Sequence, residues 1–141
     1  MERTYAMIKP DAVEKGAIGP IVATITESGL KVVALKMFRL TKTQAEGFYG
    51  VHRERPFFGE LTQWMASGPV VGMILEGDDA IKRWRDLMGP TDATKAGPET
   101  IRGRFGASLQ NNAVHGSDAT DTAAFEMGFI FSGAELAALD G

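Results

Sequence analysis

The run Val70-Val71-Gly72-Met73-Ile74-Leu75 gives the clearest indication of the architecture, because an unbroken apolar run of this length is typical of a strand buried inside a sheet. It begins directly after Gly68-Pro69, a pair that ends the preceding helix. Asp78-Asp79 follows it and supplies an acidic start for the next helix. A central strand between two helices is therefore the first element of the predicted architecture.

The sequence before and after this strand alternates between strand-like and helix-like patterns. Upstream we expect a strand, a helix, a long strand, a short helical stretch and another helix, at residues 4–9, 18–25, 30–40, 43–49 and 55–67. Downstream we expect a helix, an irregular stretch, a helix, a strand and a short C-terminal helix, the first four at residues 81–88, 89–112, 117–125 and 127–131. The irregular stretch is rich in glycine and proline, and long segments of this kind inside compact domains are usually functional.

This order resembles a doubled split β-α-β unit, with four antiparallel strands and helices on one face. The predicted fold class is an α/β (α+β) sandwich of the ferredoxin-like kind, formed by one domain over residues 1–141. A chain of 141 residues suits a single domain of ordinary size. The same fold serves binding modules, regulatory domains and enzymes, so it does not assign a function.

Composition removes several classes of chemistry. The chain has no cysteine and only two histidines, His52 and His115, which excludes disulfides, thiol nucleophiles and Cys/His metal clusters. Hydrophobic residues make up 44% and charged residues 23%, values close to those of an ordinary globular protein. The chain shows neither a signal-peptide pattern nor an apolar run long enough to cross a bilayer, so we expect a cytoplasmic protein.

Charge is distributed unevenly along the chain. Residues 1–70 carry nine Lys and Arg against seven Asp and Glu, whereas residues 71–141 carry six against eleven, which together give the net charge of −3. Nonspecific binding of nucleic acid usually needs a broad basic face, so this pattern favours a small anionic ligand over a long polyanion. For any single arginine, simple solvation of the surface remains the alternative.

Two common phosphate-binding motifs are absent, namely the P-loop and the glycine-rich Rossmann turn. A nucleotide would then be held by side-chain cations that contact phosphate oxygens and by an aromatic ring that stacks on the base. Arg85, Arg102 and Phe57 fit those needs, since one ring of the Phe57-Phe58 pair should stay exposed.

The densest run of polar residues extends from Asn112 to Asp118 and contains His115. A neutral imidazole is a competent nucleophile toward phosphorus, and its second nitrogen needs an acceptor, for which Glu126 is the nearest suitable downstream carboxylate. Ser117 and Asp118 are candidate caps of the next helix. A structural role for a lone histidine in a loop stays open at this point.

Three other polar residues have ordinary explanations beside functional ones. Lys9 ends the first strand, where it reaches the loop end of the sheet or pairs with Asp11 or Glu14. Tyr49 fits a packing residue at a helix end, and His52 fits a solvated loop.

Five short blocks of the sequence, in this order and spread over almost the whole chain, resemble the signatures of the nucleoside diphosphate kinase family. They are Lys9-Pro10-Asp11, Arg55-Pro56-Phe57-Phe58, Ser67-Gly68-Pro69-Val70-Val71, Thr100-Ile101-Arg102-Gly103 and Asn112-x-x-His115-Gly116-Ser117-Asp118. The resemblance implies reversible transfer of the γ-phosphate of a nucleoside triphosphate such as ATP or GTP to a nucleoside diphosphate, through a phosphohistidine and with Mg²⁺.

The resemblance also implies a role for individual residues. His115 would be the nucleophile, Glu126 would bond its other ring nitrogen, and Tyr49 and Ser117 would support its surroundings. Phosphates would be held by Arg85, Thr91 and Arg102, ribose hydroxyls by Lys9 and Asn112, and the base by Phe57. Lys9 would also lie near the transferred phosphoryl group, and Asp118 would help place water around Mg²⁺.

The chain departs from the family pattern at three positions, Glu99, Arg104 and Ala119, of which Glu99 adds a negative charge close to Arg102. The resemblance further implies a dimer-based homo-oligomer, and the short C-terminal end favours a tetramer. Two rivals to a kinase are a nucleotide-binding or regulatory module without turnover and a nucleic-acid-binding protein. The acidic tail and the lack of a broad basic stretch weigh against the latter.

Overall fold

The computed structural model describes residues 1–141 and contains one antiparallel sheet with the strand order β2-β3-β1-β4. The strands are β1 (Glu2–Ile8), β2 (Lys31–Phe38), β3 (Val70–Gly77) and β4 (Val114–Gly116). β1 and β3 pair along their whole length, from Glu2 opposite Gly77 to Ile8 opposite Val71. The expected four-stranded antiparallel sheet is confirmed, and the apolar run at residues 70–75 is one of its two central strands.

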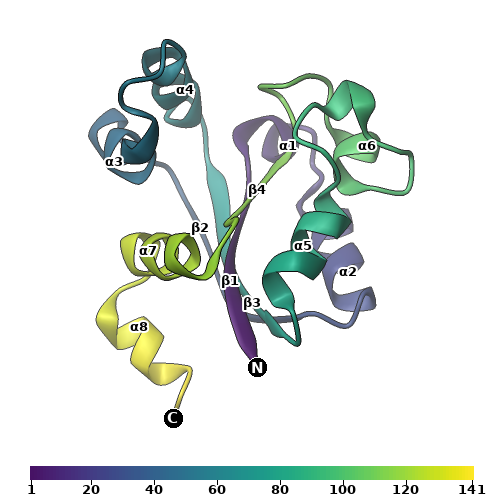
Figure 1. The fold of residues 1–141 in the computed structure, drawn as a ribbon, viewed down its shortest axis with the longest axis vertical. Helices are drawn as coiled ribbons and strands as arrows, with labels where there is room; N and C mark the ends of the chain where they lie inside the picture. Colours follow the sequence, from purple (N-terminus) through teal and green to yellow (C-terminus); the bar gives the residue numbers. More distant parts are fainter.

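Helices cover both faces of the sheet rather than one (Figure 1). Ala6 and Ile8 on β1 contact one buried cluster, while Tyr5 and Met7 contact another on the opposite face. Side chains alternate between the two faces of a strand, so a strand that is apolar at every position needs cover on both sides. The expectation of helices on a single face was therefore wrong, although the continuous apolar run already pointed to double cover.

Each face has its own set of helices. The first is covered by α1 (Pro10–Glu14), α2 (Ile18–Glu27), α5 (Ala80–Met88) and α6 (Ile101–Phe105). The second is covered by α3 (Lys42–Phe48), α4 (Phe58–Met65), α7 (Thr120–Ile130) and α8 (Gly133–Ala138). Two short 3₁₀ turns, η1 (Gly50–His52) and η2 (Ala93–Lys95), complete the regular structure. None of the helices combines the length and the apolar character that spanning a membrane requires.

The fourth strand lies elsewhere than the sequence pattern predicts. Residues 127–131 belong to the end of α7 and the residue after it, and the fourth strand is instead Val114–Gly116, paired with β1. A short apolar run does not distinguish a strand from a buried helical segment, and Met127, Ile130 and Phe131 are apolar because they pack on the sheet. A strand of three residues that includes histidine and glycine has no recognisable period of its own.

Candidate active site

A cavity of about 540 Å³ lies beside β4 and the end of β1 and gathers residues from distant parts of the chain. Eight residues that the sequence singled out line it, namely Lys9, Tyr49, Phe57, Arg85, Thr91, Arg102, Asn112 and His115. This volume falls within the range of ordinary small-molecule sites. Several further lining residues are not marked by the sequence, including Glu60, Leu109 and Gln110, which belong to none of the motifs described above.

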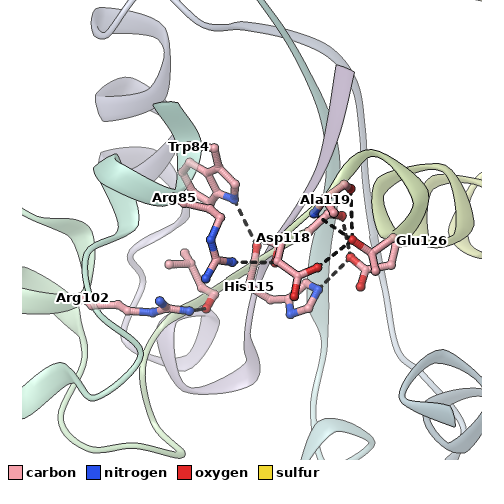
Figure 2. Close-up of polar contacts among 11 residues, drawn as sticks. Trp84, Arg85, Arg102, His115, Asp118, Ala119 and Glu126 are labelled. Carbon is pink, nitrogen blue, oxygen red and sulfur yellow. Dashed lines mark hydrogen bonds and ion pairs between the residues drawn. The ribbon is translucent and has the colours of Figure 1, made fainter. Parts of the chain in front are cut away.

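His115 sits on the sheet rather than in a loop, because β4 pairs it directly with Met7 of β1. Its Nε2 lies 2.9 Å from Oε1 of Glu126 on α7, and Ser117 Oγ donates to the same carboxylate oxygen at 2.7 Å. Glu126 lies on one side of the imidazole and Arg85 and Arg102 lie on the other (Figure 2). When the Glu126 carboxylate accepts a hydrogen bond from Nε2–H, the ring nitrogen with a free lone pair is Nδ1.

The backbone of His115 is fixed as firmly as its ring. Trp84 on α5 donates its indole N–H to the His115 carbonyl oxygen at 3.2 Å. A Cβ added to Gly116 would lie 2.5 Å from that indole nitrogen, so the glycine next to the histidine makes room for Trp84. The spacing of apolar residues predicts Trp84 as a core residue, and nothing in that pattern indicates its hydrogen bond to the site.

Aromatic rings pack around the imidazole on its remaining sides. The rings of Phe48 and Tyr49 meet it edge to face, with centroids 5.4 and 5.9 Å away. Burial raises the pKa of the Tyr49 hydroxyl, and the nearby charge of Glu126 adds to the rise, so the phenol stays protonated. Such close packing restricts the rotation of the His115 ring.

The two arginines of the cavity differ in burial. Arg102 is 6% exposed, and its guanidinium donates to the carbonyl oxygens of Gly89 and Val114 at 2.9 Å each. Arg85 is exposed and makes one long contact of 3.5 Å to the Gly116 carbonyl. Burial lowers the pKa of Arg102 to about 10, with the charge of Arg85 as a second cause. Neither arginine has a carboxylate within ion-pairing distance, so neither guanidinium charge is paired.

Lys9 adds a third cation to the lining of the cavity. Its Nζ donates to Oδ1 of Asn112 at 2.8 Å, and the amide of Asn112 donates to the Thr91 carbonyl at 2.9 Å. Burial lowers the pKa of Lys9 to about 8, because the partly compensating charge of Asp11 is weaker than desolvation. Lys9 forms no ion pair with Asp11 or Glu14, so the ordinary explanation given for it above is wrong.

The mouth of the cavity is apolar. Phe57 is 48% exposed, whereas Phe58 packs against the second core cluster, as the sequence predicted for this pair. Leu109, exposed to 63%, also lines the cavity. An exposed ring of this kind offers a stacking surface to a flat heterocycle.

Three candidates do not line the cavity, namely Ser117, Asp118 and Glu126, the last of which lies behind the His115 ring. Asp118 lines a separate cleft that shares Arg85, and its Oδ1 accepts from Thr122 Oγ1 at 2.8 Å. The cap position of α7 is Ala119, so the prediction that Ser117 or Asp118 caps this helix was wrong. Ser117 instead bonds Glu126, as described above.

The positions that depart from the family pattern also point away from the cavity. The Glu99 carboxylate folds over Gly97, and Arg104 donates to Thr24 on α2 at 3.1 Å. Ala119 likewise does not line the cavity.

The fold and the cavity together define a class of protein in which a cationic cavity, suited to a small and multiply charged anion, lies beside a half-buried, oriented histidine. The family model for nucleoside diphosphate kinase matches residues 2–136. A nucleoside diphosphate kinase of Desulfovibrio desulfuricans is 58% identical over 136 residues, which cover 96% of this chain and 98% of that protein. The chain belongs to the nucleoside diphosphate kinase family.

Solved structures agree with this assignment. The nucleoside diphosphate kinase of Aquifex aeolicus superposes with a TM-score of 0.93 at 52% identity, over 95% of this chain and 97% of that one. A halophilic nucleoside diphosphate kinase from Halobacterium salinarum in complex with CDP superposes with a TM-score of 0.91 at 43% identity, over 95% and 90% of the two chains. The resemblance seen in the five sequence blocks is confirmed.

Proposed function

We propose that this nucleoside diphosphate kinase transfers a γ-phosphate in two steps through His115. In the first step Nδ1 attacks the γ-phosphorus, the bond from phosphorus to the β,γ-bridging oxygen breaks, and the nucleoside diphosphate leaves. In the second, a terminal oxygen of another nucleoside diphosphate attacks the phosphohistidine and restores the neutral ring. The observation that carries this proposal is the contact between Glu126 and Nε2, which reserves Nδ1 as the nucleophile.

The charges of the cavity fit the needs of this transfer. Phosphoryl transfer depends mainly on in-line positioning and on neutralising the phosphate oxygens. In our proposal Arg85, Arg102 and the hydroxyl of Thr91 hold the phosphates, since the two guanidiniums lack carboxylate partners. Tyr49 and Ser117 support the imidazole through packing and through Glu126.

Recognition of the nucleoside follows from the remaining residues. Lys9 and Asn112, already bonded to each other, would contact the ribose hydroxyls, and Lys9 would also approach the transferred phosphoryl group. Phe57 at the mouth would stack on the base. Stacking and sugar contacts do not read the edge of a base, so we expect ATP, GTP and other nucleotides to be accepted alike.

Mg²⁺ would enter together with the nucleotide. No group of three or more His, Asp or Glu side chains in the structure could hold a metal ion, so phosphate oxygens would be its main ligands. Asp118 would act only through water, since it lies outside the lining of the cavity. The ion would neutralise charge on the transferred phosphate.

The test is to incubate the protein with γ-labelled ATP and Mg²⁺ and to look for acid-labile, base-stable label on the chain. We expect His115→Ala to abolish the label, and added GDP to discharge it from the unsubstituted protein. His52→Ala, which removes the other histidine, is the matched control and should label normally. Folded protein that binds nucleotide but takes no label would instead support a binding or regulatory module without turnover.

We also propose a cytoplasmic homo-oligomer, with a tetramer favoured. β2 is an edge strand, and it carries Leu35 and Met37 at 50% and 56% exposure. Exposed apolar side chains on an open strand edge favour association between copies. Light scattering of the purified protein measures the mass directly, and a monomeric mass would contradict this part of the proposal.

A further inference from the structure

We infer that Asp11 is a positioning residue that fixes a strained turn at Ala113 and thereby sets the places of Asn112 and His115. This inference rests on the proposed function of His115. Asp11 lies in the first turn of α1, yet its Oδ2 accepts the backbone N–H of Ala113 at 3.1 Å, across 102 positions of the chain. No side-chain capping bond is made by Lys9 at the start of α1, and the Asp11 carboxylate reaches the site through its bond to Ala113.

Ala113 has an unusual backbone. Its φ is +73°, one of only two positive values at residues other than glycine. The N–H of Val114 donates to the carbonyl of Asn112 at 2.8 Å, which closes a three-residue turn around Ala113. A γ-turn with positive φ at its centre is rare and strained, and it persists only where the surroundings enforce it.

Both backbone polar groups of Ala113 are held where β1 joins α1, by Lys9 and by Asp11 in the first turn of α1. Asp11 accepts its N–H, and the N–H of Lys9 donates to its carbonyl oxygen at 2.8 Å. Ala113 itself is fully buried, so water cannot replace either bond. Two residues of the Lys9-Pro10-Asp11 block therefore hold the turn at Ala113, Lys9 through its backbone N–H and Asp11 through its carboxylate. We call this pair of contacts the clamp.

The turn stands directly between two residues of the proposed mechanism. Asn112, one residue before it, bonds Lys9 and Thr91 in the wall of the cavity. His115, two residues after it, enters the pairing with β1. If the turn relaxed to a negative φ, the direction of the chain would change between these residues. The Asn112 amide and the His115 imidazole would then no longer keep their positions relative to each other.

The inference is tested by a double-substitution cycle, because glycine adopts positive φ without strain. We expect Asp11→Ala to slow the labelling of His115 at saturating ATP by about tenfold. This factor corresponds to the free-energy cost of holding one strained backbone conformation. In the background Ala113→Gly, which relieves the strain, the same substitution should cost roughly threefold or less. Asp11→Asn keeps an oxygen that can accept the Ala113 N–H and should label at close to the normal rate.

The control is Glu2→Ala, which removes another carboxylate that accepts a distant backbone N–H, that of Ile81 at 2.9 Å, without any contact to the turn. Its effect on the labelling rate should be the same in the unsubstituted protein and in the Ala113→Gly background. If the losses from Asp11→Ala are equal in both backgrounds, the clamp is overturned. If Asp11→Ala alone does not fold, the double variant should recover a cooperative thermal transition, and its failure to do so also overturns the clamp. Absence of label on the unsubstituted protein would instead contradict the proposed function.

Discussion

The two walls of the cavity are held in different ways. The His115 wall, lined by β4 and Tyr49, is held by sheet pairing, ring packing and the contact with Glu126 on α7. The arginine segment, residues 89–112, contains only short helical turns, and the side chains of Arg102 and Asn112 bond its own carbonyl oxygens. In the His115 wall, chemistry and stability depend on different contacts, whereas in the arginine segment the groups that would bind phosphate also hold the chain in shape.

The largest effect that this comparison predicts is on chemistry alone. Glu126→Gln places an amide beside Nε2 in place of an obligatory acceptor, so the tautomer with a free Nδ1 is no longer enforced. We expect the rate of His115 phosphorylation to fall by roughly a hundredfold, while nucleotide affinity and thermal stability change little. Rapid-quench labelling measures the rate, and Asp121→Asn, at the exposed start of the same helix, is the control. An equally large loss of nucleotide affinity in Glu126→Gln would show that the contacts of the His115 wall serve binding as well as chemistry, which contradicts the comparison.

The second prediction concerns the two arginines. Lysine cannot span the carbonyl oxygens of Gly89 and Val114 as the guanidinium does, so Arg102→Lys should lose binding and stability together. We expect nucleotide affinity to fall by at least about tenfold and the free energy of unfolding by about 2 kcal/mol. Arg85→Lys, at an exposed position with one long contact, should weaken binding with an unchanged melting temperature. Calorimetric titration and thermal unfolding of both variants provide the comparison, and equal melting temperatures would contradict it.

The third prediction concerns Lys9, which joins the two walls. Its pKa of about 8 means that it loses its proton as the pH rises from about 7.5 to about 9.5, and nucleotide affinity should fall by roughly three- to tenfold. The stability of the ligand-free protein should move the other way. The unfolded chain keeps this proton to near pH 10.5 and the folded chain does not, so the contribution of Lys9 to the free energy of unfolding rises with pH between about 8 and 10.5.

Lys9→Arg keeps its charge over this whole range and should remove both trends. Affinity is measured by titration at each pH and stability by denaturant unfolding. Affinity that stays level in the unsubstituted protein across the range would show that Lys9 is not the group that titrates against the nucleotide.

The sequence predicted more of the site than of the sheet around it. Lys9 and Arg102 could be grouped because they belong to the family blocks, and Arg85 because the resemblance implies a phosphate contact for it; all three line one cavity. The strand that carries His115 could not be predicted, because its three residues owe their extended form to pairing with β1. The roles of Trp84 and Asp11 were equally hidden, since each depends on a backbone group brought close by the fold.

The smallest expected effect is that of Glu99, which belongs to the arginine segment but does not line the cavity. Glu99 stands beside Arg102 in the sequence pattern, and a carboxylate facing the cavity would repel the nucleotide. In the structure that carboxylate folds over Gly97, the side chain is exposed, and it does not line the cavity. Solvent screens a charge placed in this way, so Glu99→Gly should change the affinity for a diphosphate by less than about twofold.

Glu60 is the matched comparison for Glu99, because it is an acidic residue that does line the cavity. Glu60→Gln should strengthen diphosphate binding more than Glu99→Gly does, since it removes a negative charge from the cavity itself. Titration of both variants at low and high salt separates the two positions, because only an effect of charge decreases as salt increases. A larger, salt-sensitive gain from Glu99→Gly would mean that the segment brings this carboxylate to the phosphates, and that its charge matters as well as its shape.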